Sequence, residues 1–278
     1  MVSWILMRRA ITSIKGGRIL DLREWIGTLP GIYGVFAKNL DTGKVFTFND
    51  TKVFPSASTI KVPILIELYR RVEEEHLSLD HLLVMRREDQ VGGSGVLKDL
   101  SPNTEYSLRD LATLMITVSD NTATNLLIDF LTIEAVNITL RRLGITHTEL
   151  VRRLQRVPAE PLDTVNHTTA QDMGLLMEKL ATGTAISLAA SEQMVSLLKR
   201  CQGPISITKL TAESSWVGDS PIVIAHKTGS LAQASHDVGI VYSPHLRYVA
   251  ALLSQGRPYL SLLANIQRIG AKLSVALR

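Results

Sequence analysis

The two ends of the chain carry segments whose hydrophobic pattern is typical of β-strands. Residues 32–37 and 45–48 are rich in apolar and β-branched side chains, and Asp41-Thr42-Gly43 lies between them. Two such runs around a D-x-G sequence predict a β-hairpin. Near the other end, three further runs have the same character: 222–226, 238–242 and 248–253. We expect them to be strands of one antiparallel sheet.

Between these two sets of strands the apolar residues follow a helical period. In residues 58–75, Ile60, Ile64 and Leu68 recur at the spacing of one helix face. Pro63 lies early in this segment, where helices tolerate proline best, so the helix start near Ser58 is expected to be tight or distorted. Further helices are predicted at 11–29, 106–118, 121–131, 168–180, 187–198 and 259–277.

Two of these helices begin with residues that are typical N-caps. Ser107 precedes one apolar period and has Asp110 three residues later. Thr168 or Thr169 is expected to cap the helix that follows. We also expect the stretch 166–172 to anchor the base of the loop before that helix.

The order of these elements predicts an α/β (α+β) fold, in which both chain ends build one antiparallel sheet. Terminal helices would flank the sheet, and an all-helical lobe would be inserted between the two sets of strands. We expect residues 1–59 and 206–278 to form the α/β lobe and residues 60–205 the helical lobe. The cleft between two lobes is a natural position for an active site.

Composition narrows the class of protein. The 278 residues are 45% hydrophobic and 20% charged, which is typical of a globular chain rather than a disordered one. The net charge is +4 and no run of Lys or Arg occurs, so no nucleic-acid partner is predicted. The seven histidines lack metal-ligand spacing, so no metal is expected. Cys201 is the single cysteine, which excludes an intrachain disulfide, and we interpret it as a small packed residue.

The N-terminal segment does not have the pattern of an export signal. Residues 2–7 are apolar, but Arg8 and Arg9 follow them, whereas a secretory leader places its charges first. No long uncharged apolar run occurs later, so no membrane span is predicted. The compartment is left open, and a monomer is expected.

Three short motifs carry candidate chemistry. They are S-x-x-K at residues 58–61, S-D-N at 119–121 and K-T-G at 227–229. On a helix, residues three apart share a face, so Lys61 can reach back to Ser58. A serine hydroxyl needs a base to become a nucleophile. A lysine can be that base if burial and a nearby cation lower its pKa, and Lys227 would supply the cation.

The remaining motif residues fit the needs of acyl transfer. Ser119 can relay a proton to a leaving nitrogen, and Asn121 can bind a substrate amide. The hydroxyls of Thr228 and Ser230, together with Lys227, suit a substrate carboxylate.

Backbone groups of the same motifs could serve the substrate as well. The N–H groups of Ser58 and Ser230 could stabilise an oxyanion. Gly229 would let a substrate lie along its strand. Asp120 is expected to face inward as a structural partner.

Two other arrangements of residues are weaker candidates. Ser56 has Thr59 rather than a lysine three residues later, which makes it the poorer nucleophile. A triad of Ser58 with His236 and Asp237 is conceivable, but adjacent residues on a strand point to opposite faces.

The motifs together resemble the class A β-lactamase family, and more narrowly its penicillin-binding-protein-like branch. The segments that carry the resemblance are FPSASTIKVPILIELY, GSGVLKDL, YSLRDLATLMITVSDNTATNLLID, NHTTAQDM and AHKTGSLAQASHDVGIVYSP. The resemblance implies a sheet lobe with a helical lobe, covalent acylation of Ser58 by β-lactams or acyl-D-alanyl peptides, and no cofactor. Proteins of that family are usually exported.

One departure from the family concerns deacylation. Class A β-lactamases carry a glutamate in the loop before the Thr-Thr segment, where it activates water. Alignment of this loop backward from Asn166 places that position on Arg153, and alignment forward places it on Pro158. Glu160 is either a displaced base or a solvated loop residue, and we favour the second.

These observations predict a serine hydrolase that is acylated at Ser58 and hydrolyses the β-lactam amide with slow deacylation. The alternatives are a penicillin-binding D-alanyl-D-alanine carboxypeptidase-like enzyme and an esterase on the same scaffold. A non-catalytic binding module is a third possibility, but a pure binder has no need of Lys61.

Overall fold

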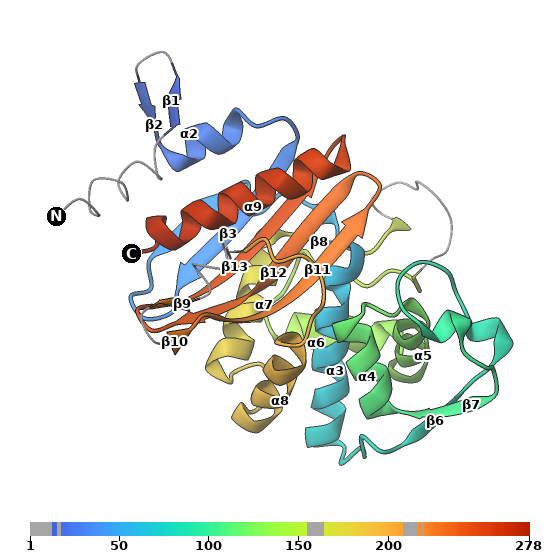
Figure 1. Cartoon of the computed structure of the whole chain (residues 1–278). Coiled ribbons are helices and arrows are strands. Elements are labelled where there is room, and N and C mark those ends of the chain that lie inside the picture. The colour runs from blue at the N-terminus through green and yellow to red at the C-terminus, as the bar shows by residue number, and fades with distance from the viewer. Residues whose placement is uncertain (1–12, 16–17, 155–163, 208–215, 218–219) are drawn as a thin grey trace.

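A five-stranded antiparallel sheet lies at the centre of the molecule, with the strand order β11-β12-β13-β3-β4 (Figure 1). The structure is a computed structural model, and it describes residues 13–15, 18–154, 164–207, 216–217 and 220–278. The strands of the sheet are β3 (Ile32–Asn39), β4 (Val45–Phe48), β11 (Val223–Leu231), β12 (Ala234–Ser243) and β13 (Leu246–Gln255). The predicted hairpin and the three later strands are therefore confirmed, and β11 is an edge strand.

Helices cover both faces of this sheet. The helices are α2 (Leu22–Gly27), α3 (Lys61–Glu74), α4 (Leu108–Thr117), α5 (Asn121–Leu131), α6 (Ile133–Arg142), α7 (Ala170–Thr182), α8 (Leu188–Leu198) and α9 (Tyr259–Ala276). In Figure 1, α9 crosses one face of the sheet, and α3 to α8 lie on the other side. The fold class is as predicted: an antiparallel sheet with flanking terminal helices and a helical middle.

Short strand pairs complete the fold outside the main sheet. They are β1 (Ser13–Lys15) with β2 (Arg18–Leu20), β5 (Phe54–Pro55) with β8 (His167–Thr168), β6 (Leu82–Met85) with β7 (Thr104–Ser107), and β9 (Trp216–Val217) with β10 (Ser220–Pro221). The pair β5–β8 joins the segment before Ser58 to the segment before α7.

Two hydrophobic cores hold the layers together. On one face of the sheet, Trp25 and Ile26 of α2 and Ile266 of α9 are buried against strand residues such as Val35. The other core joins the opposite face of the sheet to the helical middle of the chain. The division into lobes at 59/60 and 205/206, with a cleft between them, stays a prediction.

The first predicted helix, at 11–29, is confirmed at residues 22–27 and is wrong at residues 13–15 and 18–20. Those two stretches are the strands β1 and β2, and α2 begins only at Leu22. Its start is set by Asp21, whose side chain accepts a hydrogen bond from the Glu24 amide at 2.8 Å. A capping carboxylate of this kind satisfies an N–H group that has no partner inside the helix, so the helix begins there.

The helix predicted at 58–75 also begins later than expected. A 3₁₀ turn, η1 (Ala57–Ile60), comes first, and α3 starts at Lys61. Pro63 is the third residue of α3, where its missing N–H costs no hydrogen bond. Ser58 therefore lies on a tight turn in front of the α-helix, in line with the distortion that Pro63 predicted.

The N-caps follow the sequence closely. Ser107 accepts from the Asp110 amide at 3.1 Å, and Thr169 accepts from the Asp172 amide at 3.1 Å. Thr169 is therefore the cap of α7, and Thr168 lies in β8.

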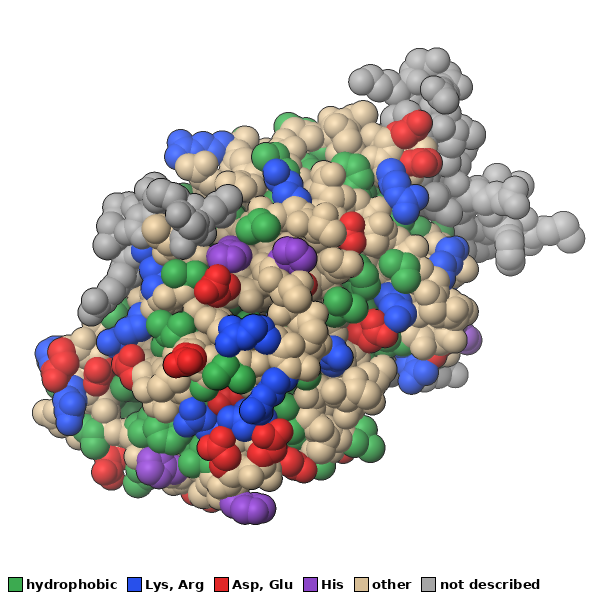
Figure 2. All heavy atoms as spheres, turned by 180° about the vertical axis from the view of Figure 1, so that it is seen from behind, with side chains coloured by type: hydrophobic (Ala, Val, Ile, Leu, Met, Phe, Trp, Pro, Cys, Tyr) green, Lys and Arg blue, Asp and Glu red, His purple; other side chains and the backbone are tan. Residues whose placement is uncertain are grey.

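The surface shows no separation of charge on the face in Figure 2, where basic and acidic side chains are intermixed.

Among the described helices, none is by itself long and apolar enough to cross a membrane, although α5 and α6 together meet those criteria with an 80° bend between them.

Candidate active site

The three motifs meet around Ser119. Lys61 Nζ donates to the Ser119 carbonyl oxygen at 2.6 Å, to Ser119 Oγ at 3.0 Å and to Asn121 Oδ1 at 2.9 Å. Lys227 Nζ donates to the same Ser119 Oγ at 3.2 Å and to the Thr228 carbonyl oxygen at 2.9 Å. The Ser119 hydroxyl therefore lies between two lysine amines, one from α3 and one from β11.

Both lysines are removed from water, whereas the two serines are not. Lys61 and Lys227 are each 0% exposed, and Ser58 and Ser119 are partly exposed. Burial holds the pKa of Lys61 well below its ordinary value, and the charge of Lys227 lowers it further. Burial also lowers the pKa of Lys227, and the nearby carboxylate of Asp237 opposes this shift only in part. The lowered pKa favours a neutral Lys61 amine, whose two N–H groups can donate to the Ser119 carbonyl oxygen and Asn121 Oδ1 while its lone pair is able to accept a proton.

Lys61 does not hydrogen-bond to Ser58 in this conformation. Within the described residues, all three hydrogen bonds of its amine go to the S-D-N segment. The expected contact across one helix face is thus replaced by contacts with Asn121, the first residue of α5, and with Ser119, two residues before that helix. Catalytic hydrogen bonds often tighten only when substrate is bound, so this geometry is compatible with proton transfer.

The backbone is strained on both sides of this cluster. Ala57, directly before Ser58, has φ of +47°, and Ser119 has φ of +57°. A side chain in this region costs on the order of 1–3 kcal/mol, and such residues concentrate at functional sites.

Gly229 allows the edge strand to approach the nucleophile turn closely. A Cβ at this position would lie 3.1 Å from the Ala57 Cβ, 3.2 Å from the Ser56 carbonyl oxygen and 3.2 Å from the Ser58 nitrogen. The Ser58 N–H is therefore held against β11. Ser230 follows as an exposed residue, and its hydroxyl lies 3.1 Å from that of Tyr259.

Asp120 holds the S-D-N segment from inside the protein, as expected. Its Oδ2 accepts from the amides of Val96 and Leu97 at 2.6 and 2.8 Å, and its Oδ1 accepts from Ala123 at 2.9 Å. These bonds cap α5 and fix the loop opposite Asn121.

His236 serves the backbone and forms no triad. Its Nε2 donates to the Pro55 carbonyl oxygen at 2.8 Å, and its Nδ1 accepts from the Ser254 amide at 3.1 Å. Burial lowers the pKa of His236 to about 4, so the ring is neutral. Asp237 points to the other face of β12 and contacts His226 instead, at 2.7 Å.

The base of the following loop is tied to the same site. Asn166 Oδ1 accepts from the amides of Val151 and Arg152 at 2.7 and 2.9 Å, and the Asn166 carbonyl oxygen accepts from the Ser56 amide at 2.8 Å. The stretch 166–172 thus anchors the loop and begins α7, as predicted. Ser56 is fully buried, which agrees with its rejection as the nucleophile.

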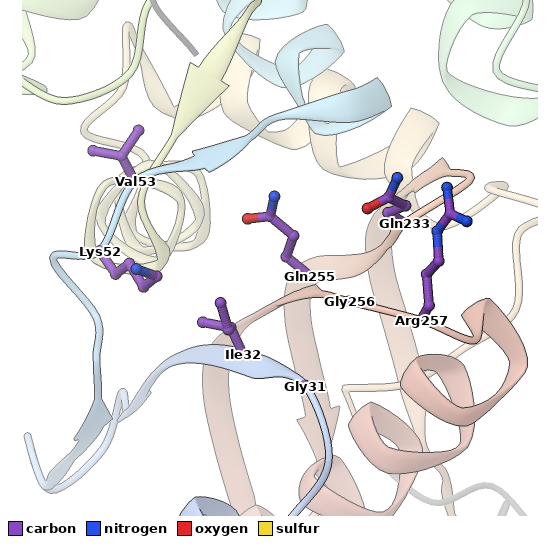
Figure 3. Close-up of a pocket in the computed structure, with 8 residues that line it drawn as sticks. All are labelled: Gly31, Ile32, Lys52, Val53, Gln233, Gln255, Gly256 and Arg257. Atoms are coloured by element: carbon purple, nitrogen blue, oxygen red, sulfur yellow. The ribbon is translucent and has the colours of Figure 1, made fainter. Parts of the chain in front are cut away.

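A separate hollow of about 550 Å³ lies at one end of the sheet (Figure 3). It is lined by Gly31, Ile32, Lys52, Val53, Gln233, Gln255, Gly256 and Arg257. No residue of the three motifs lines it, so we assign the candidate chemistry to the lysine cluster. In the described part of the chain, no three His, Cys, Asp or Glu side chains are grouped to hold a metal ion.

Comparison with known proteins shows the family of the chain. The model of the β-lactamase enzyme family matches residues 20–277. The chain belongs to this family. A β-lactamase of Phocaeicola vulgatus is 28% identical over 244 residues, covering 81% of this chain and 73% of that protein. The β-lactamase structure from Sphaerobacter thermophilus is 32% identical with a TM-score of 0.84, covering 92% of this chain and 95% of that one. The structure of PBP-A is 30% identical with a TM-score of 0.79 and the same coverage.

The loop that carries the deacylation base in class A β-lactamases is only partly described here. Pro158 and Glu160 lie outside the described residues, between residues 154 and 164. Arg153 is described, and its guanidinium lies 3.2 Å from the Asp129 carboxylate. The backward alignment of the loop therefore places a cation, Arg153, where class A β-lactamases have the glutamate, and this cation is paired with Asp129 of α5.

Sequence reasoning missed two neighbours of the site, His226 and Gly203. His226 stands directly before the K-T-G motif, and Gly203 lies against Thr228. The position of His226 beside the motif was a visible signal. Its partner Asp237 could be found only from the pairing of β11 with β12.

Proposed function

We propose that this member of the β-lactamase family is a serine hydrolase that β-lactams acylate at Ser58. The observation that carries the proposal is the buried Lys61, held between Ser119 and Asn121 beside a second buried lysine. A lysine in such surroundings is a competent base, which a structural lysine need not be.

In the proposed acylation, the neutral Lys61 amine takes the proton of Ser58 as Oγ attacks the lactam carbonyl carbon. The negative charge that develops on the carbonyl oxygen is stabilised by the N–H groups of Ser58 and Ser230. The C–N bond then breaks, and the proton passes from Lys61 through the Ser119 hydroxyl to the departing nitrogen. Both lysines contact that hydroxyl, which supports its role as the relay.

Recognition is assigned to the residues around this relay. Asn121 would bind the acylamide of the substrate, since its side chain faces Lys61. Lys227, Thr228 and Ser230 would bind the substrate carboxylate, with Gly229 giving the substrate access to the edge strand β11.

We further propose that deacylation is slow. Hydrolysis of the acyl-enzyme needs a base within hydrogen-bond reach of a water molecule. Arg153 cannot act as a base, and Pro158 has no titratable group. Glu160 is the remaining candidate, and we favour a solvated position for it. PBP-A has been crystallised as an acyl-enzyme with penicillin G in a variant that replaces a leucine with glutamate, which is the comparison that supports acyl-enzyme chemistry here.

Mass spectrometry of the protein during reaction with penicillin G tests both steps. We expect a Ser58 adduct that persists for many minutes, and no adduct in Ser58→Ala. An adduct on Ser56 or Cys201 would overturn the assignment of the nucleophile. Rapid steady hydrolysis in the wild type, with an adduct only in Glu160→Gln, would refute slow deacylation.

The similarity to PBP-A favours one second candidate, a penicillin-binding D-alanyl-D-alanine carboxypeptidase-like enzyme. This enzyme would use the same Ser58 and Lys61 but release D-alanine from an acyl-D-alanyl-D-alanine peptide. Release of D-alanine that depends on Ser58 would support it, and an inert peptide would leave the β-lactam activity as the function.

A further inference from the structure

A buried ion pair lies directly behind the K-T-G motif. His226 Nδ1 is 2.7 Å from Asp237 Oδ1, and the two side chains are 2% and 0% exposed. Because β-strand side chains alternate, His226 lies on the face of β11 opposite to Lys227. Asp237 is the cross-strand partner of Thr228, and Gly239 is the partner of His226. The pair therefore joins the edge strand β11 to β12, beside Thr228, which we assign to carboxylate binding. Figure 1 shows these two strands side by side.

Gly239 allows β12 to approach β11 closely beside His226. A Cβ at Gly239 would lie 2.6 Å from the His226 Cβ and would also clash with the Ala225 carbonyl oxygen, so a side chain there would displace β11 at His226. A buried ion pair contributes little net stability compared with well-packed apolar residues, since both charges lose their hydration. A gain in folding stability is therefore a poor explanation for why a histidine and an aspartate occupy these two buried positions.

The second oxygen of Asp237 reaches a different segment of the chain. Asp237 Oδ2 accepts from the amides of Ser206 and Ile207 at 2.6 and 3.1 Å. These residues belong to the segment 202–207 after α8, which we call the connecting segment. At the start of the segment, the Gln202 amide donates to the Thr117 carbonyl oxygen at 2.9 Å.

The connecting segment packs against Thr228. A Cβ at Gly203 would clash with Thr228 Oγ1, so the glycine backbone lies against the threonine side chain. On its other side the segment touches α9, where a Cβ at Gly270 would clash with the Ser206 carbonyl oxygen. Thr228 is therefore confined by a segment that Asp237 holds in place.

We propose that His226 and Asp237 are positioning residues for the carboxylate-binding side of the site. The pair fixes the connecting segment 202–207 and β11 relative to each other, and so aims the Thr228 hydroxyl at the substrate carboxylate. This inference rests on the proposed function, because it concerns substrates that carry such a carboxylate.

The test compares two substrates that differ only in this group, a chromogenic acyl ester with a free carboxylate and its methyl ester. In Asp237→Asn and His226→Phe, we expect KM for the free carboxylate to rise roughly tenfold to a hundredfold, the range of a hydrogen bond to a charged group. The methyl ester should change by less than about twofold, and kcat should change little for either substrate.

Glu178→Gln is the control, because it removes a different ion pair, which joins α7 to Lys38 of β3 at 2.6 Å. Its KM for both substrates should equal that of the wild type. Thermal unfolding of each variant checks that the protein is folded before KM is compared.

Equal losses on both substrates, or no loss on either, would overturn the positioning role. The proposed function has a separate readout, since a wild-type protein without a penicillin adduct would refute that function. A normal wild-type adduct together with unchanged selectivity in Asp237→Asn would overturn this inference alone.

Discussion

Replacement of Gly229 with alanine tests how closely β11 must approach the nucleophile turn. The new Cβ would lie 3.1 Å from the Ala57 Cβ and 3.2 Å from the Ser58 nitrogen. Ordinary contacts begin near 3.4 Å, so η1 and β11 must separate by a few tenths of an ångström. The φ of Gly229 is not positive, so alanine adds crowding without backbone strain.

The expected effect on folding is small, and the effect on acylation is larger. Overpacking costs about 1–3 kcal/mol, and the loss of freedom in the unfolded chain offsets about 0.4–1 kcal/mol of this. A displacement of roughly 1 Å can reduce a rate by about 100-fold. For a few tenths of an ångström we therefore expect the acylation rate to fall by roughly fivefold to tenfold.

The assay is the second-order rate of acylation by penicillin G, followed by quenched mass spectrometry, with thermal unfolding in parallel. Gly27→Ala is the matched control, because a Cβ at Gly27 meets no atom within 4 Å. That variant should acylate like the wild type. Acylation of Gly229→Ala at the wild-type rate would refute the argument that this glycine sets the position of Ser58.

Further predictions concern the charged groups. Lys61→Ala should slow acylation by an uncharged ester by roughly 10²–10⁴-fold, and Lys227→Ala should slow it far less, as single-turnover rates would show. Equal losses would contradict the division of roles. Because the pKa of Lys61 is lowered, acylation should proceed at neutral pH and decline as pH falls through that pKa, measured as a pH–rate profile on the same ester. Asp237 holds the pKa of His226 above its ordinary value, against the effect of burial. The stability that this pair adds should therefore be complete below the ordinary histidine pKa and lost as pH rises through the raised one. Melting temperatures from pH 5.5 to 9 should show this loss in the wild type and not in Asp237→Asn. Ser58→Ala should lower the free energy of unfolding by no more than about 0.5–2 kcal/mol, measured by thermal unfolding, while losing all β-lactam adducts.

Local sequence signals were sufficient for most elements of the fold. Ser107 and Thr169 cap helices because capping depends on residues three apart, and the strands follow from short apolar runs. The failure at residues 13–15 and 18–20 has the same origin, since the period there did not separate two short strands from a helix. Asp21 was the signal that could have placed the start of α2.

In the candidate site, too, some features could be predicted from local sequence and others depended on how the elements pack. S-x-x-K, S-D-N and K-T-G were recognisable as motifs, and their chemical types fixed the expected roles of Ser58, Lys61 and Lys227. The reach of Lys61 towards Ser119 and Asn121, rather than Ser58, depends on how α3 packs against the start of α5. The residue pattern of a single helix or strand cannot predict the distance between Lys61 and a residue of another element.

The amino-acid sequence alone thus determined which residues can carry the chemistry and in which elements they lie. Tertiary structure decided their protonation and their neighbours. The pKa of Lys61 depends on its burial and on a lysine from a distant strand, and the pairing of His226 with Asp237 depends on the register of β11 with β12. Electrostatic energies follow distance in space and removal from water, and folding sets both by contacts between segments far apart in the chain.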